Sequence, residues 1–514
     1  MTDDVTFYDD VELYCSALSV APGESLGLHL SSRHDAVDVT VERWGAERVH
    51  VAQIPGVATE YHAPADNADS HGCGWPITAE VEVGEDWVPG FYLVTATATA
   101  AATGRDVAHA GFVVHARPPD RQSALLVLGT NTWNSYNTWG GASLYTGGHQ
   151  VSFRRPWPRG LLSRPEVERD DRKSRPVRFG EEPDADGEIF QSYRLANGYS
   201  PAIGSTGWFS HERRFVEWAE GQGYRFDYAV SSDFDQYPEL LDGYDLVIGV
   251  GHDEYWTKAG RDQVDAHVAG GGDYVSMSGN TMFWQVRLVD DDGADGTDHM
   301  IGHKYQGHSN DVEAGADMSG LWCDPLVARP EWTTLGAGSV FGLYHRFGQA
   351  TPRGAGGFTV FRYDHWMFEG TGLRYGDLLG ADHGVVGYET LGCPISLDDF
   401  QLPVAKPVEG MPADHEIVGL CLSSNLGVGE YPKSISALND QGDLEFLAER
   451  YYGDTSPENL ARVRHGNAVM VVCRPQGPDG GEVVTIGTTD WVFGLAQDPL
   501  VAHVTTNILN RYLG

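Results

Sequence analysis

An apolar segment over 246–250 is followed by a glycine and then by four residues whose side chains can bind a metal ion or transfer protons. These residues are His252, Asp253, Glu254 and Tyr255. In an open parallel sheet, ligands bind just beyond the carboxyl ends of the strands, and polar groups placed there are usually functional. We therefore expect a functional site at this point of the chain.

The surrounding pattern predicts the elements that would position these residues. The β-branched run 246–250 is typical of a buried strand, 259–268 of a helix, and 274–278 of a second strand, which together form a βαβ unit. The second strand leads into Asn280, so the two strand ends would open into one crevice. In the alternative interpretation, His252–Tyr255 simply start a helix whose dipole Asp253 and Glu254 complement.

Composition excludes several classes of function. The chain has 514 residues and a formal net charge of −38, which disfavours nucleic acids and anionic membranes as partners. No signal peptide and no apolar run long enough to span a membrane occur, so we expect a cytoplasmic protein. The acidic, lysine-poor composition is typical of a halophile-like protein, although a high-GC genome explains the shortage of lysine equally well.

Nucleophile-based hydrolysis is disfavoured by the sequence. The six cysteines are scattered without a C-x-x-C pair, and neither a G-x-S-x-G elbow nor an H-E-x-x-H helix is present. The 14 tryptophans keep open a different class, a non-catalytic protein that binds a carbohydrate or another protein. Metal analysis of the purified protein would separate a metal enzyme from such a binding protein.

The pattern changes along the chain and predicts four parts. In residues 1–118, apolar and polar residues alternate as in the strands of an all-β, Ig-like sandwich. Residues 119–292 show strand and helix patterns in turn, as in the first part of an α/β domain. We expect 293–450 to be a β-rich insertion that contributes to the site, and 451–514 to return to the α/β domain with its closing strands and helix. The Arg-, Pro- and Asp-rich stretch 154–178 is expected to be an exposed loop.

Several motifs in this order resemble the large (beta) subunit of N,N-dimethylformamidase. They are Asn134-Ser-Tyr-Asn-Thr-Trp-Gly-Gly141, His252-Asp-Glu-Tyr-Trp256, Ser278-Gly-Asn-Thr-Met-Phe-Trp284, Gly387-Tyr-Glu389 and Gly487-Thr-Thr-Asp-Trp491. The likeness extends over nearly the whole chain, and the order and spacing of the motifs carry it rather than any one of them.

The resemblance implies a fold, a cofactor and a reaction. The catalytic domain would be a flavodoxin-like parallel sheet, similar to class I glutamine amidotransferases without their cysteine. The enzyme would hydrolyse a formamide-type or other small amide with a water activated by one Fe³⁺ ion. That ion would be held by two tyrosines and one glutamate. The enzyme would be a homo-oligomer, with or without a separate small subunit.

On this sequence the implied ligands are Tyr255, Glu389 and Tyr228. Tyr136 is the alternative to Tyr228, and Glu369 the alternative carboxylate. The catalytic candidates are three. His252 or Glu254 would shuttle protons or orient a ligand, and Asn280 would steady the carbonyl or the oxyanion.

Overall fold

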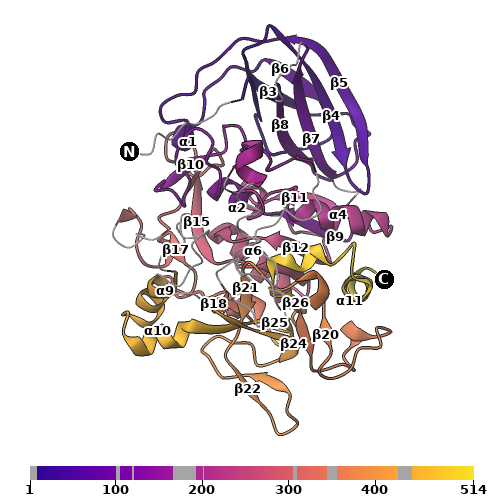
Figure 1. Cartoon of the computed structure of the whole chain (residues 1–514), viewed down its shortest axis with the longest axis vertical. Helices are drawn as coiled ribbons and strands as arrows, with labels where there is room; N and C mark the ends of the chain where they lie inside the picture. Colours follow the sequence, from indigo (N-terminus) through magenta and orange to yellow (C-terminus); the bar gives the residue numbers. More distant parts are fainter. Residues whose placement is uncertain are drawn as a thin grey trace.

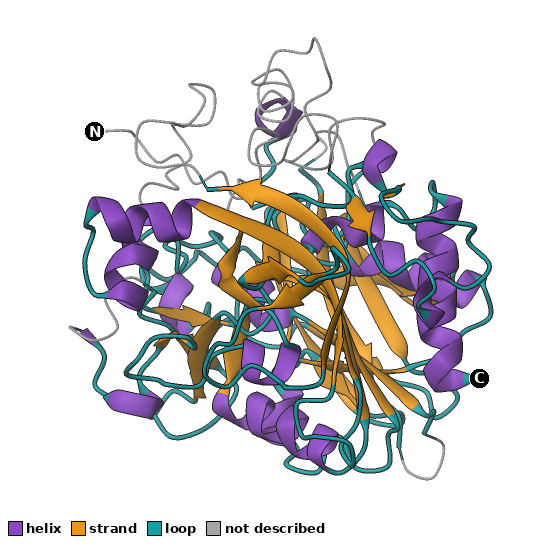
Figure 2. Cartoon of the chain, turned by 90° about the horizontal axis from the view of Figure 1, so that it is seen from below, coloured by secondary structure: helices purple, strands orange, loops and turns teal. Residues whose placement is uncertain are grey.

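A mixed α/β architecture surrounds one large sheet of nine strands (Figures 1 and 2). The computed structural model describes residues 9–99, 105–117, 121–165, 193–200, 202–304, 310–343, 356–425 and 443–514. Within these ranges, no helix is long and apolar enough to cross a membrane.

The central sheet combines a parallel and an antiparallel half. Its strands run side by side as β11 (Asp227–Val230), β9 (Ala124–Leu128), β12 (Leu246–His252), β14 (Asp273–Gly279), β26 (Val483–Ile486), β25 (His465–Cys473), β24 (His415–Ser424), β19 (Phe358–Val360) and β20 (Leu378–Leu379). The first five are parallel to one another, whereas each later pair is antiparallel. A parallel sheet was therefore the correct prediction for one half only.

Helices cover both faces of the parallel half, as Figure 2 shows. Leu126 and Ile248 pack in one core cluster with α4 (Glu212–Gly221) and α11 (Pro499–Leu513), whereas their neighbours Leu125 and Val247 pack in another with α6 (Lys258–Ala269). Adjacent strand residues point to opposite faces, so burial on both sides explains why these strands are continuously apolar.

The N-terminal part forms two β-sheets with a common core (Figure 1), and the short helix α1 (Ala68–His71) lies in the connection between their strands β5 and β6. The five-stranded sheet contains β2 (Ser19–Val20), β8 (Val107–Val114), β7 (Gly90–Ala98), β4 (Ala36–Trp44) and β5 (Arg48–Ala58). The three-stranded sheet contains β1 (Val11–Cys15), β3 (Ser25–Ser32) and β6 (Ala79–Glu82). Strands thus dominate this part as predicted, whereas the Ig-like type and the boundary at 118/119, which lies outside the described residues, stay predictions.

Smaller elements complete the fold. One further sheet contains β10 (Gln150–Ser152), β16 (His299–Ile301), β15 (Trp284–Val289), β13 (Tyr255–Thr257) and β17 (Gly320–Leu321). Two two-stranded sheets pair β18 (Gly338–Leu343) with β21 (Thr390–Gly392) and β22 (Ile395–Leu397) with β23 (Pro403–Ala405). Short helices are α1 (Ala68–His71), α2 (Thr130–Ser135), α5 (Asp233–Gln236), α8 (Trp332–Leu335), α9 (Asp443–Tyr452) and α10 (Pro457–Arg464).

The predicted βαβ unit is confirmed as β12, α6 and β14. The alternative in which His252–Tyr255 start a helix is wrong. His252 ends β12, Tyr255 begins β13, and α6 begins only at Lys258, where the Thr257 hydroxyl caps it by accepting a hydrogen bond from the Gly260 N–H at 3.1 Å. Asp253 and Glu254 thus lie in a turn between two strands and not in a helix.

Two parts of the chain differ from their expected roles. Arg155 is 1% exposed, so the prediction of an exposed loop is wrong there, and the part of 154–178 from residue 166 onward lies outside the described residues. The region 293–450 supplies β19, β20 and β24 to the central sheet. It is therefore joined to the α/β core by strand pairing.

An ion pair joins the N-terminal sheets to the α/β part. Arg43 of β4 donates to both carboxylate oxygens of Glu220 in α4, at 2.9 and 2.7 Å, and the Tyr228 hydroxyl donates to the same carboxylate at 2.7 Å. Burial alone would raise the pKa of Glu220, but these donors and the charge of Arg43 hold it below its usual 4.5.

We predict that Glu220→Gln lowers the free energy of unfolding at neutral pH by about 2 kcal/mol, because Arg43 keeps its charge without a counter-ion. A depressed carboxyl pKa stabilises the fold above about pH 4.5, and this stabilisation is lost as the pH falls through the folded-state value. The deficit of the variant should therefore narrow between about pH 5 and pH 3 in urea titrations. Exposed Glu239→Gln is the control; an equal deficit at both pH values would contradict the assignment.

Candidate metal centre

Three parts of the chain meet beyond the carboxyl ends of β12 and β14. His252 pairs in register with Gly279, and Asn280 follows directly. A Cβ atom on Gly279 would lie 2.2 Å from the carbonyl oxygen of Glu389, so the absent side chain lets the segment before β21 pass close by. The polar ends of β12 and β14 and the chain at Glu389 thus share one crevice.

Three side-chain oxygens converge at this point. The Tyr145 hydroxyl lies 2.6 Å from the Tyr136 hydroxyl and 2.7 Å from Glu254 Oε2, and the Tyr136 hydroxyl lies 3.3 Å from the same carboxylate atom. The two tyrosine rings stack with their centroids 4.1 Å apart. Both tyrosines belong to the irregular segment that follows α2, whereas Glu254 lies between β12 and β13.

Neighbouring groups fix the orientation of Glu254. Its Oε1 atom accepts a hydrogen bond from the Trp284 indole at 2.8 Å, and the Lys304 ammonium lies 3.6 Å from that atom. The Thr132 hydroxyl of α2 accepts from the Glu254 N–H at 2.8 Å. Since Oε1 is occupied, Oε2 is the atom that faces the tyrosines.

A histidine and a second carboxylate lie beside this group. His252 Nε2 is 2.5 Å from Glu389 Oε2 and 3.4 Å from Glu254 Oε2. His252 and Glu389 therefore form an ion pair, and Glu254 is a second anion beside the imidazole. His252 Nδ1 donates to the Ser205 carbonyl at 2.8 Å, which makes Nε2 the atom that gains or loses a proton.

The site is buried, and burial dominates its electrostatics. Burial raises the pKa of Tyr136 and Tyr145 well above 10.0, and the charge of Glu254 raises both further. Burial raises the pKa of Glu389, with His252 opposing it. Burial would lower the pKa of His252, but the charges of Glu389 and Glu254 outweigh it and raise that pKa. Without a further cation, both phenols would therefore stay protonated.

The residues fit a hard metal ion. Ligands at right angles around an ion at about 2.0–2.1 Å lie roughly 2.9 Å apart. The three oxygen separations of 2.6 to 3.3 Å bracket that value. Ligating atoms of His252, Glu254 and Glu389 also lie within 4.8 Å of one another. Phenol and carboxylate oxygens suit a hard cation, and the His252–Glu389 ion pair lies beside them.

The structure brings most of the predicted site residues together. His252, Glu254 and Glu389 form the cluster, and the Tyr255 hydroxyl lies 3.3 Å from the Lys304 ammonium at its edge. Asn280 has a left-handed backbone, with φ 51°, and its buried Oδ1 has no partner among the described residues.

Tyr228 and Glu369 lie elsewhere. Tyr228 sits in the middle of β11, so its side chain meets the sheet face and bonds Glu220 at 2.7 Å instead of reaching the strand ends. Glu369 is exposed, and its carbonyl accepts from Asn507 of α11. Of the alternatives, the structure places Tyr136 in the cluster.

Sequence reasoning missed three neighbours of the site, Tyr145, Lys304 and Tyr388. The Gly140-Gly141 pair that follows Tyr136 signals a tight return of the chain, and this signal could have suggested Tyr145. The Tyr388 hydroxyl lies 2.9 Å from that of Tyr136. The backbone of Tyr388 has a left-handed conformation, with φ 56°. This conformation lets two side chains that are adjacent in sequence, Tyr388 and Glu389, reach the same cluster.

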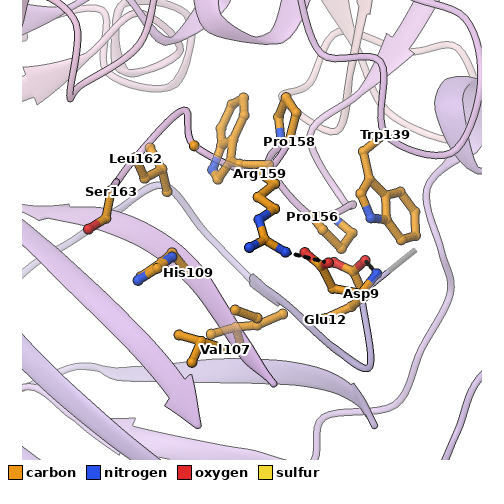
Figure 3. Close-up of a pocket in the computed structure, with 14 residues that line it drawn as sticks. Asp9, Glu12, Val107, His109, Trp139, Pro156, Pro158, Arg159, Leu162 and Ser163 are labelled. Atoms are coloured by element: carbon orange, nitrogen blue, oxygen red, sulfur yellow. Dashed lines mark hydrogen bonds and ion pairs between the residues drawn. The ribbon is translucent and has the colours of Figure 1, made fainter. Parts of the chain in front are cut away.

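Two cavities in the described structure lie away from this cluster. One is enclosed between β1, β8 and the segment 156–163, and Figure 3 shows Arg159 reaching across it to Asp9. The other opens at the opposite ends of β12 and β14. Neither includes a residue of the cluster.

Comparison with known proteins places the chain. A family model described as N,N-dimethylformamidase beta subunit-like, C-terminal, matches residues 37–506. The chain belongs to this family. It is also 34% identical over 74 residues to the N,N-dimethylformamidase beta subunit of an Alcaligenes species. That match covers 14% of this chain and only 10% of the relative, so family membership rests on the long match.

We predict that Gly279→Ala disrupts the site. Its Cβ would lie 2.2 Å from the Glu389 carbonyl and 2.6 Å from the Thr489 nitrogen, so backbone must move, at a cost of about 2 kcal/mol or more. Gly221→Ala in α4 is the matched control, because its Cβ meets nothing within 4 Å and alanine favours a helix. Urea unfolding of the two variants tests this, and wild-type stability of Gly279→Ala would show that the close approach is wrong.

Proposed function

We propose that this protein is an iron-dependent hydrolase of small amides, of the formamide type or closely similar, in which Tyr136, Tyr145 and Glu254 hold one Fe³⁺ ion. The observation that carries the proposal is the convergence of their three oxygens, with separations of 2.6, 2.7 and 3.3 Å, inside a buried site. Membership in the dimethylformamidase-like family supports the reaction class.

Charge balance favours a trivalent ion. Two phenolates and one carboxylate carry three negative charges, so Fe³⁺ makes a neutral group that can be buried. A strong positive charge is also what two buried phenols with raised pKa values need in order to ionise. Three protein ligands leave room for water and substrate, as in catalytic metal sites.

The protein's own groups would handle the protons of the reaction. When bound, the ion would supply Lewis acidity toward the amide carbonyl and acidify a water. Glu389 is positioned to take a proton from the attacking water. His252 Nε2, which lies 2.5 Å from Glu389 Oε2, is positioned to hold that proton and to give it to the leaving amine. The Ser205 carbonyl keeps the imidazole in the required tautomer.

Two further residues would orient the substrate and the ligands. Asn280, whose buried Oδ1 has no partner among the described residues, can receive a hydrogen bond from a substrate N–H group. Lys304 lies over the Tyr145 and Trp284 rings, at 3.8 and 4.5 Å from their centroids, and would hold both against Glu254.

The quaternary structure is part of the proposal. The Alcaligenes relative is named a beta subunit, and the matched segment covers a tenth of its length. We propose that this chain forms a homo-oligomer. Its activity should be assayed with the purified chain alone and together with any chain that co-purifies.

We predict that the purified protein binds about one iron per chain and shows a visible phenolate-to-iron absorption band. Tyr136→Phe and Tyr145→Phe should each shift or abolish the band. Tyr228→Phe is the control, because that hydroxyl bonds Glu220, and it should keep the wild-type spectrum. An unchanged band in both site variants, or an active protein free of iron, would refute the assignment.

We further predict that the carboxylates of Glu254 and Glu389 have different roles. Glu254→Gln should lose iron, because it removes a ligand. Glu389→Gln should keep the iron and its band but lower kcat on a small formamide by about 10²–10³-fold, because it removes the proton acceptor. Metal analysis and turnover of both variants test this; loss of iron from Glu389→Gln would restore Glu389 as a ligand.

A further inference from the structure

The segment from Tyr136 to Tyr145 must hold two side chains in one geometry although it contains neither helix nor strand. Sites that bind metal require their ligands to be held within about half an ångström. A free loop of this length would not provide that precision, because each unfixed residue carries conformational entropy. The contacts that hold the segment are therefore part of the site.

Arg155 holds the segment from within the protein. Its guanidinium donates to the carbonyl oxygens of Trp139 at 2.6 Å, Asn137 at 3.1 Å and Ser152 at 3.0 Å, and to Asn134 Oδ1 at 3.5 Å. These acceptors lie on both sides of Tyr136. Burial lowers the pKa of Arg155 to about 10, and the charge of Asp69 opposes that shift. The buried guanidinium thus holds these backbone carbonyl oxygens close together by hydrogen bonds.

Asp69 holds the same segment from the N-terminal β part. Its Oδ2 atom accepts a hydrogen bond from the Ala142 N–H at 2.6 Å. Cβ atoms on Gly140 and Gly141 would lie 3.2 Å from Ala68 Cβ and 2.5 Å from Asp69 Oδ2, and both glycines have positive φ. The Gly-Gly pair is therefore explained by close contact with α1, in the connection between β5 and β6.

An aromatic contact extends this junction. Trp75, also from the connection between β5 and β6, meets Trp139 edge to face, with centroids 5.7 Å apart. Trp139 also lines the cavity in Figure 3, which lies against β1 and β8. The outer side of the tyrosine segment is thus built against the N-terminal sheets.

We propose that Asp69 and Arg155 are positioning residues that set the separation of Tyr136 and Tyr145, which makes the N-terminal β part a component of the metal site. The inference rests on the proposed function for the role of the two tyrosines. It adds that Asp69, which belongs to the N-terminal β part and does not contact the ion, controls how tightly the ion is bound.

The test compares Asp69→Ala with Asp69→Asn, whose amide oxygen can still accept from Ala142. Exposed Asp66→Ala is the matched control, and Arg155→Lys is compared with its outward-facing neighbour Arg154→Lys, whose side chain pairs with Asp291 and Asp298. Iron dissociation into a chelator, the position of the phenolate band and hydrogen exchange over 136–146 in the metal-free protein are measured for each.

We expect Asp69→Ala and Arg155→Lys to release iron about 10-fold faster or more, with a shifted band and faster exchange at 140–142. Asp69→Asn should stay close to wild type, and the two controls should match it. Wild-type iron release and band in Asp69→Ala would overturn the inference, as would equal effects of Asp66→Ala. If wild-type protein bound no iron, the proposed function would fail, while the exchange data would still decide whether Asp69 holds the segment.

Discussion

The structure depends on one buried carboxylate, Glu254, and on what surrounds its Oε2 atom. Two phenols, an imidazole and a second carboxylate lie around this atom, whereas Oε1 is held by Trp284 and Lys304. Buried carboxylates and phenols are costly unless a counter-charge or hydrogen bonds compensate them. Lys304 faces Glu254, and the carboxylates raise the pKa of His252 beside Glu389, so each carboxylate has a basic partner. In the proposed site, a metal ion would supply positive charge at the point where the two phenol oxygens meet Glu254.

No single element of the fold could build this receptor. The parallel strands β12 and β14 deliver His252, Glu254 and Asn280 at adjacent ends, as expected for an α/β sheet. The other groups arrive differently, the tyrosines from the irregular segment after α2 and Glu389 from the segment before β21. Gly279 permits the approach of Glu389, and left-handed Tyr388 turns two successive side chains to the same side. The left-handed backbone of Asn280 and Tyr388 and the missing side chain of Gly279 thus lie where separate segments meet.

This division explains what could be predicted from the sequence. The βαβ unit and the strand-end residues follow from hydrophobic periodicity, which is local. Tyr228 was assigned to the site because it lies close to a strand end in sequence, yet alternation turns it onto the sheet face toward α4. Tyr145 and Lys304 come from segments without periodicity, and their approach to Glu254 depends on long-range packing. Arg155 lies in a stretch whose composition is typical of exposed loops, and composition does not reveal the carbonyl oxygens of Trp139, Asn137 and Ser152 that its buried guanidinium bonds.

The N-terminal β part packs against the α/β part at more than one place. It contacts the α/β part through the Arg43 pair with Glu220 and, separately, through Asp69 and Trp75 at the tyrosine segment. A rigid body held at one contact can rotate freely about it, whereas contacts at separate places restrict that rotation. The ion pair on α4 and the contact of Asp69 with Ala142 therefore both constrain how the N-terminal sheets sit against the α/β part. In the proposed site, the stability of this interface and the geometry of the two tyrosines would depend on the same packing arrangement.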